Sequence, residues 1–256
     1  MMLVEEGKVS LDVGVREYLP EVPEKWDSVT VRNLLTHTSG IFNYTNVVPF
    51  VALGKRDYTQ DQIVRMVSDL KLNFAPGIKF EYSNTNYYLL GMMVERISGE
   101  AYWSFMENRI FRPLGMTHTR NGDPKTVIEN RAAGYFWNGK TWLNMAPLTS
   151  TAGWAAGSLV STVEDMAKWD AALYTEMLLK SETLKQIFTP AKLKNGKDAH
   201  GLRLRLGERG EERAPARRTQ RRHSRLLFQH FALSEGQLDG GRPHEFGGVR
   251  RRSGSH

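Results

Sequence analysis

The stretch Gly77-Ile-Lys-Phe-Glu-Tyr-Ser-Asn-Thr-Asn-Tyr-Tyr-Leu-Leu-Gly91 decides the fold of this chain, because it joins an extended segment to a helix. Its pattern predicts a turn at residues 75–77, extended backbone from Lys79 to Tyr82, and a helix that begins just after Asn84. Backbone N–H groups are unpaired in the first turn of a helix, so Tyr82 and Asn84 would face the same space as these donors. A phenol can exchange a proton, and a carboxamide can hold a substrate carbonyl. The structural alternative is that Tyr82 packs and Asn84 caps the helix.

Four blocks of sequence stand in order along the chain. They are Leu34-Leu-Thr-His-Thr-Ser-Gly40, residues 74–91, Phe111-Arg-Pro-Leu-Gly-Met116 and Thr151-Ala-Gly-Trp-Ala-Ala-Gly-Ser-Leu-Val-Ser161. In order and spacing they resemble the serine β-lactamase and penicillin-binding-protein family, in particular class C β-lactamases, D,D-peptidases and type VIII esterases. The resemblance covers residues 1–201. It implies an α+β fold in which helices flank an antiparallel sheet and a helical subdomain is added, and this chain would hold mainly the helical part.

That family builds its active site from three motifs, which are Ser-x-x-Lys, Tyr-x-Asn, and Lys-Thr-Gly or His-x-Gly. Tyr82-Ser83-Asn84 matches the second motif, so the resemblance implies that Tyr82 and Asn84 are catalytic. The His-x-Gly motif is absent. Ser68-Asp-Leu-Lys71 is a Ser-x-x-Lys, but it closes a predicted helix only fourteen residues before Tyr82, and the family's nucleophile lies much further upstream. The resemblance therefore places the serine about a dozen residues before Met1, roughly three helical turns away.

Residues 131–145 predict a β-hairpin whose strands are joined by Asn138-Gly139 as a type I′ turn. The resemblance places this segment over the cleft, which makes Tyr135, Trp137 and Trp142 candidate substrate-binding residues. The alternative, equally open, is that these rings shield the core. His37 is interpreted as a packing residue and not as a base.

Helical periodicity and capping residues predict several further elements. They are the end of a helix at residues 1–7, a short helix at 29–36 capped by Thr30, helices at 59–70, 85–98, 101–111 and 181–188, and a helix opened by the capping box Ser161-Thr-Val-Glu164. The small residues at 152–158 suit a close approach of the backbone to the cleft.

The net charge of +7 lies entirely in the last part of the chain. Residues 201–256 hold thirteen arginines, no lysine and six acidic residues, whereas the remaining 22 basic and 22 acidic residues balance. We back-translated two parts of this region with suitable codons and read the codons one base later. Residues 202–206 then give Phe-Gly-Phe-Gly, and residues 219–226 give His-Ser-Gly-Gly-Ile-Pro-Gly. Both peptides resemble strands of the family that are missing from this chain. We therefore interpret residues 1–201 as a β-lactamase-like domain that lacks its first and last segments. Residues 202–256 are interpreted as an Arg-rich tail that is out of frame or disordered.

The sequence also limits the possible functions. The absence of cysteine excludes disulfides and thiolate chemistry, and no apolar run is long enough to span a bilayer. The resemblance implies a serine hydrolase that transfers an acyl group from a small-molecule β-lactam, D-Ala peptide or short-chain ester through an acyl-enzyme. It implies no metal, no organic cofactor and no nucleic-acid partner, and a periplasmic or extracellular location for full-length members, although no signal segment is recognised here.

The chain as written is expected to be weakly active or inactive, because it lacks the nucleophile motif. Two other function classes stay open at this point. One is a non-catalytic binding relative that keeps the cleft. The other is a nucleic-acid binder that uses the Arg-rich tail.

Overall fold

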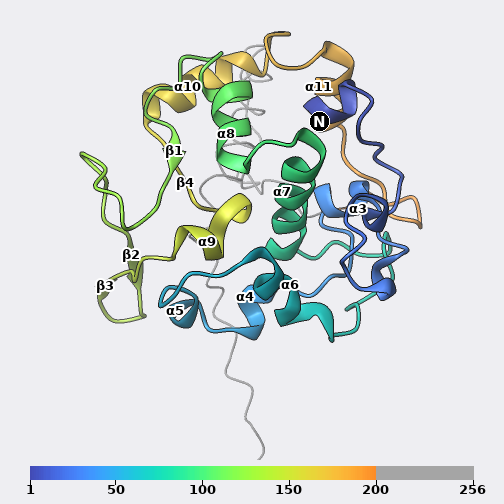
Figure 1. Ribbon diagram of the computed structural model, residues 1–256, viewed down its shortest axis with the longest axis horizontal. Coiled ribbons are helices and arrows are strands. Elements are labelled where there is room, and N and C mark those ends of the chain that lie inside the picture. The colour runs from blue at the N-terminus through green and yellow to red at the C-terminus, as the bar shows by residue number, and fades with distance from the viewer. Residues whose placement is uncertain (200–256) are drawn as a thin grey trace, which may run out of the picture.

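The computed structural model describes residues 1–199 (Figure 1). The predicted tail at residues 202–256 lies outside the described residues. The helices are α1 (Met2–Glu5), α2 (Val15–Tyr18), α3 (Val31–Leu35), α4 (Tyr44–Val47), α5 (Phe50–Leu53), α6 (Gln60–Ser68), α7 (Asn84–Ser98), α8 (Tyr102–Met106), α9 (Ser150–Gly153), α10 (Val163–Ala172) and α11 (Ser181–Phe188). Short 3-10 turns lie at Glu24–Trp26 and Trp154–Ala156, and a π-helical turn at Glu107–Phe111 continues α8.

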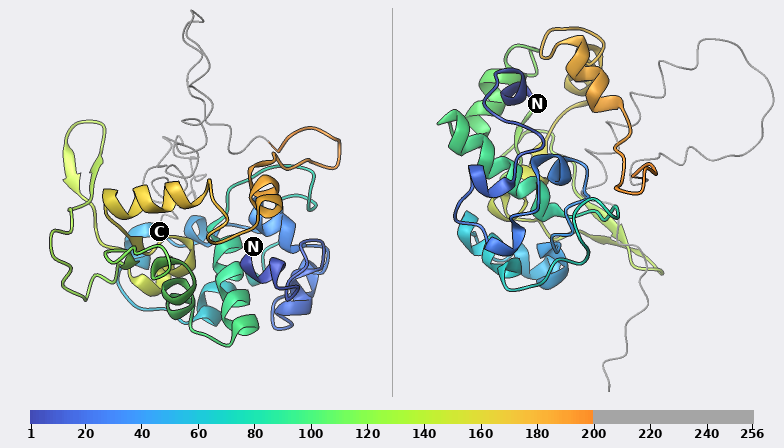
Figure 2. Two further views of the ribbon diagram at one scale, coloured as in Figure 1. Left: turned by 90° about the horizontal axis from the view of Figure 1, so that it is seen from above. Right: turned by 90° about the vertical axis from the view of Figure 1, so that its right-hand side faces the viewer.

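Two small antiparallel sheets complete the described fold. Strand β1 (Arg120–Asn121) pairs with β4 (Leu159–Val160), and β2 (Tyr135–Trp137) pairs with β3 (Trp142–Asn144). The β2–β3 hairpin projects from the body of the molecule (Figure 2). Helices around small antiparallel sheets form an α+β arrangement, as the sequence predicts. None of the described helices is long and apolar enough to cross a membrane.

Helix α7 lies at the centre of the molecule, between α3 and α8 (Figure 1). Ser83 precedes it in an extended conformation, and Gly99 ends it at φ +73°, a left-handed conformation that suits glycine. Its residues Tyr88, Leu89 and Met93 are buried in the main core. The predicted helix at 85–98 is confirmed.

The turn at Trp154–Ala156 packs directly on α7. A Cβ at Gly91 would lie 2.4 Å from the Ala155 Cβ and 3.0 Å from the Trp154 ring, so only glycine fits here. The Trp154 ring lies 4.9 Å from that of Tyr88. The small residues at 154–156 therefore allow a close approach to α7. The predicted approach of residues 152–158 to the cleft stays a prediction.

Most of the other predicted helices are confirmed. α6 begins at a capping box between Thr59 and Gln62, and α3 begins at one between Thr30 and Asn33. α11 has the predicted bounds. α1 ends before Gly7, whose φ is +69°, and it lies beside the segment that leads into α11, where the Lys180 N–H donates to Glu5 at 2.8 Å (Figure 1).

The predicted type I′ turn at Asn138-Gly139 is wrong by one position. Trp137 pairs with Trp142, and the Asn138 N–H donates to the Thr141 carbonyl at 3.2 Å, which leaves Gly139 and Lys140 as the two turn residues. Of these residues only Gly139 has a positive φ, of +93°, whereas a type I′ turn needs two. The Asn138 side-chain oxygen explains the shift, because it accepts the N–H groups of Lys140 and Thr141 at 2.9 and 2.8 Å.

The predicted capping box at Ser161 and Glu164 is also wrong by one position. Thr162 caps α10 by accepting the Asp165 N–H at 3.3 Å. Ser161 instead lies 2.7 Å from the Thr119 hydroxyl, next to the β1–β4 pair. Tertiary contacts of Ser161 therefore take the place of its local capping role.

Candidate active site at the Tyr82–Asn84 corner

The two residues predicted to be catalytic lie together at the start of α7. The Tyr82 hydroxyl donates a hydrogen bond of 2.9 Å to the Asn84 side-chain oxygen. The Asn84 side-chain nitrogen donates to the Thr45 hydroxyl at 3.3 Å. Tyr82 is 42% exposed and Asn84 is half-buried, so solvent and small molecules reach this corner, which we define as Tyr82, Ser83 and Asn84.

The backbone of the corner is held by an upstream segment. The Glu81 N–H donates to the His37 carbonyl at 2.9 Å, and the Ser83 N–H donates to His37 Nδ1 at 3.3 Å. The Asn84 N–H donates to the side-chain oxygen of Asn43 at 3.2 Å. Residues 37–43 therefore decide where the corner lies.

His37 occupies the core directly beside Tyr82. Its side chain is fully buried, its φ is +53°, and its ring lies 4.6 Å from the ring of Tyr82 and 5.1 Å from that of Tyr87. A buried ring in contact with two aromatic rings agrees with the interpretation of His37 as a packing residue.

The electrostatic environment keeps the Tyr82 phenol neutral. Burial raises the pKa of Tyr82 above its ordinary value, so at neutral pH the hydroxyl carries its proton and acts as a donor. A phenolate would need a neighbouring cation. Lys79 pairs with Glu81 at 2.8 Å, and no cationic group within residues 1–199 contacts the Tyr82 hydroxyl.

Ser68 and Lys71 do not form a nucleophile pair. Ser68 is the last residue of α6, and its hydroxyl donates to the Val64 carbonyl at 2.9 Å. Lys71 follows after the helix has ended and is exposed. A serine activated by Ser-x-x-Lys geometry stands at the start of a helix with the lysine one turn on, which differs from this arrangement.

The three candidate substrate-binding aromatic residues lie on the β2–β3 hairpin. Tyr135, Trp137 and Trp142 are 59%, 53% and 66% exposed, so the described structure does not use them to cover its core. The register of the hairpin places them on one face, with the two tryptophan rings 5.6 Å apart. Their contact with a substrate stays a prediction.

Asn43 and Thr45 are the site residues that sequence reasoning missed. Asn43 caps α4 by accepting the Thr45 N–H at 3.3 Å, and an asparagine before a helix is a recognisable local signal. Their contacts with Asn84 join positions about forty residues apart, and no local pattern announces such contacts.

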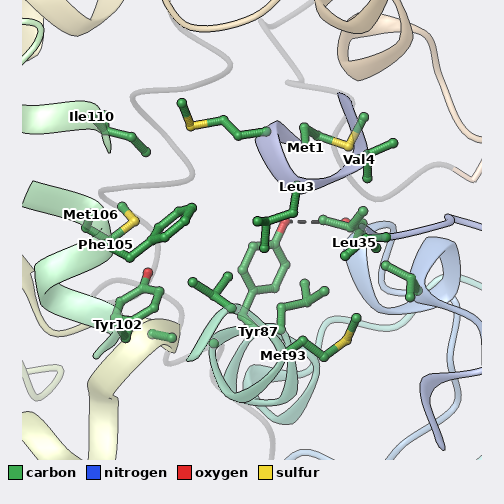
Figure 3. Close-up of a pocket in the computed structure, with 17 residues that line it drawn as sticks. Met1, Leu3, Val4, Leu35, Tyr87, Met93, Tyr102, Phe105, Met106 and Ile110 are labelled. Atoms are coloured by element: carbon green, nitrogen blue, oxygen red, sulfur yellow. Dashed lines mark hydrogen bonds between the residues drawn. The ribbon is translucent and has the colours of Figure 1, made fainter. Parts of the chain in front are cut away.

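An apolar cavity of about 230 Å³ lies elsewhere in the molecule, between α1, α7 and α8 (Figure 3). Apolar side chains and two tyrosines dominate its wall, including Met1, Leu3, Val4, Leu35, Tyr87, Met93, Tyr102, Phe105, Met106 and Ile110. The Tyr87 hydroxyl is already bonded to the Leu35 carbonyl, at 3.3 Å. None of the three corner residues lines this cavity. In the described part of the chain no cluster of three or more metal-ligating side chains occurs.

Comparison with known proteins shows the family and the fold of the chain. The family described as Beta-lactamase matches residues 1–230. A D-stereospecific amidohydrolase from Streptomyces sp. superposes with a TM-score of 0.67 at 29% identity, covering 75% of this chain and 61% of that one. A D-amino acid amidase from Ochrobactrum anthropi SV3 gives a TM-score of 0.63 at 33% identity, with 72% and 53% covered. A penicillin-binding protein from Bacillus halodurans gives 0.62 at 28% identity, with 73% and 60% covered.

The chain spans less than half the length of the curated relatives that it matches. One Bacillus subtilis relative is 33% identical over 193 residues, which are 74% of this chain and 46% of that protein. A second is 29% identical over 210 residues and is again covered to 46%. The family match covers most of the chain and the solved structures share its fold, so the chain belongs to the Beta-lactamase family.

Proposed function

We propose that the corner serves acyl transfer to a serine, with an amide or ester carbonyl as the group attacked. The observation that carries this proposal is the Tyr82–Asn84 pair itself, in which a phenol and a carboxamide share a 2.9 Å hydrogen bond at an exposed helix start. In this role Tyr82 passes a proton between the serine and the leaving group, and Asn84 holds a carbonyl or amide of the substrate.

The protonated state of Tyr82 favours one direction of proton transfer. Burial raises the pKa of Tyr82 and keeps the phenol protonated at neutral pH, so a proton is present to be passed to a leaving nitrogen or oxygen. Acting as a base towards the serine requires an ammonium beside the phenol, which the lysine of a Ser-x-x-Lys motif would supply. We propose that this serine and lysine lie outside the described residues, because Ser68 and Lys71 have the wrong geometry.

Small amides are the substrate class that we favour. The two similar amidases act, by their names, on D-amino acid amides and with D-stereospecificity, and both resemble this chain over about three quarters of its length. β-Lactams and short-chain esters are the other substrates that the family resemblance suggests. The exposed face formed by Tyr135, Trp137 and Trp142 is our candidate for the substrate side chain.

A hydrolysis assay tests the proposal. D-phenylalanine amide, nitrocefin and p-nitrophenyl butyrate are each offered to the 256-residue chain and to the gene product, by which we mean the protein encoded by the genomic DNA read on both sides of codon 1 and across codon 202. We expect the chain to turn over roughly 10³-fold or more slowly than the gene product, because removing a nucleophile leaves only binding and polarisation. Binding of the amide by the gene product without turnover would identify a non-catalytic relative instead.

A further inference from the structure

The corner is held in an unusual way, by side chains from one distant segment. Ser83 and Asn84 contribute two consecutive backbone N–H groups, which donate to His37 Nδ1 at 3.3 Å and to Asn43 Oδ1 at 3.2 Å. A helix commonly takes such a bond from the side chain of its own N-cap residue. Ser83 is the N-cap of α7 and makes no such bond. Helix α7 is therefore capped from 41 positions upstream.

Asn43 joins two helix starts through one oxygen atom. The same Oδ1 accepts the Thr45 N–H at 3.3 Å as the cap of α4. Backbone N–H groups only donate, so the carboxamide must present its oxygen to both of them. This fixes the side chain of Asn43, and through it the first turn of α7 is tied to the first turn of α4.

The consequence reaches the two reactive side chains. Asn84 donates its main-chain N–H to Asn43 and its side-chain N–H to Thr45, both at the start of α4. The ring of Tyr82 packs against the ring of His37, and its hydroxyl donates a hydrogen bond to the Asn84 side chain.

Next to Asn84 in α7, the Thr85 hydroxyl donates to the Phe42 carbonyl at 2.7 Å and accepts the Tyr44 N–H at 3.1 Å, and these bonds do not depend on Asn43. If the Asn43 bond were lost, the Asn84 N–H would have no partner, and the corner itself would keep the contacts with His37 and Thr45.

We propose that Asn43 is a positioning residue of the corner: by capping α7 from a distance it holds the Tyr82–Asn84 hydrogen bond and the direction in which both side chains meet a substrate. The expected effect of Asn43 on catalysis rests on the function proposed above. Its effect on the geometry of the corner does not depend on that function.

Two variants separate the distant bond from the local cap. Asn43→Ser keeps a side chain that caps α4, because serine is a favoured N-cap, but it is too short to reach the Asn84 N–H. Asn43→Asp keeps an oxygen at the reach of the native one, so it preserves both bonds. Both residues suit a helix start, so both variants are expected to fold.

The readout is the titration of Tyr82, which is monitored by NMR of the chain labelled with 13C-tyrosine. The signal of Tyr82 is assigned by its absence from the Tyr82→Phe variant. We expect Asn43→Ser to lower the Tyr82 pKa towards the ordinary tyrosine value near 10, because a displaced phenol loses part of its remaining burial. The Asn84 side-chain amide resonance should shift in the same variant. In Asn43→Asp the Tyr82 pKa should stay at or above that of the parent, because a nearby negative charge disfavours phenolate.

Thr59→Ala is the matched control, since it removes a helix cap from α6 without touching the corner. It should lower the melting temperature and leave the titration of Tyr82 unchanged. The proposal is overturned if Asn43→Ser keeps the parent pKa and amide resonance, or if Thr59→Ala shifts them equally. In the gene product, we expect Asn43→Ser to reduce kcat/KM at least tenfold and Asn43→Asp to restore it. If the unsubstituted gene product shows no turnover, that result counts against the proposed function only. The titration of Tyr82 still decides whether Asn43 positions the corner.

Discussion

At the residue scale, the buried carboxylate of Asp165 ties the start of α10 to the turn before β1. It accepts hydrogen bonds from the His118 N–H at 2.8 Å, the Thr119 hydroxyl at 2.9 Å and Lys168 at 2.8 Å. Burial alone would raise the pKa of Asp165, but these bonds and the Lys168 charge outweigh it and hold the pKa below the ordinary value. The ionised form is therefore the one that the fold stabilises.

This arrangement predicts a pH-dependent stability. A carboxyl with a lowered folded pKa contributes stability above its unfolded pKa, near 4, and loses that contribution as the pH falls through the folded pKa. We expect Asp165→Asn to lower the free energy of unfolding by about 2 kcal/mol at pH 7. The new side-chain amide carries N–H donors, which would face the donors of His118, Thr119 and Lys168. Asp165→Asn should also flatten the loss of stability below pH 4. Urea unfolding at pH 7 and pH 3 measures both effects.

Glu164→Gln is the control for this prediction, because Glu164 is the exposed neighbour on α10. It should change the free energy of unfolding by less than about 0.5 kcal/mol at either pH. An Asp165→Asn protein with the parent's stability at pH 7 would show that Asp165 does not hold the turn.

At the scale of elements, the contact of α7 with the turn at Trp154–Ala156 depends on the absence of a side chain at Gly91. Gly91→Ala would place a Cβ 2.4 Å from that of Ala155, and the neighbouring backbone would have to move. We expect a loss of about 1–3 kcal/mol, as overpacking of a core usually costs. Thermal unfolding measures it. Arg96→Ala is the control on the same helix. It breaks only a surface ion pair with Glu21 and should cost less than about 1 kcal/mol.

The elements also show which features could be predicted from the sequence. Helices α3, α6 and α11 were predictable because their stop or cap signals are local, as with Thr30 and Thr59. The predicted hairpin turn lies one residue early, because the Asn138 side-chain oxygen accepts the N–H groups of Lys140 and Thr141. The family pattern predicts a site at Tyr82 and Asn84, whereas the bond between Asn84 and Asn43 depends on tertiary contact and has no sequence signature.

At the scale of the whole molecule, the apolar cavity between α1, α7 and α8 should bind hydrophobic probes. We expect the dye ANS to fluoresce with the native chain and Leu90→Gln, which places an amide in the wall of the cavity, to reduce the signal at least twofold. Val127→Gln, at a valine that is 94% exposed outside this wall, is the control and should leave the signal unchanged. An equal signal from the parent and the Leu90 variant, with unchanged circular dichroism, would contradict the assignment of the dye to this cavity.

The central claim is that Tyr82 belongs to an acyl-transfer site, and the rate of acylation measures it most directly. Intact-mass spectrometry of the gene product treated with benzylpenicillin follows the appearance of one acyl adduct per molecule over time. We expect Tyr82→Phe to slow acylation about 10²- to 10⁴-fold, as losing a general acid–base group does. Tyr174→Phe, at a tyrosine that is exposed to a similar extent and lies outside the corner, should stay within a few fold of the parent. Acylation of Tyr82→Phe at the parent rate would contradict the claim.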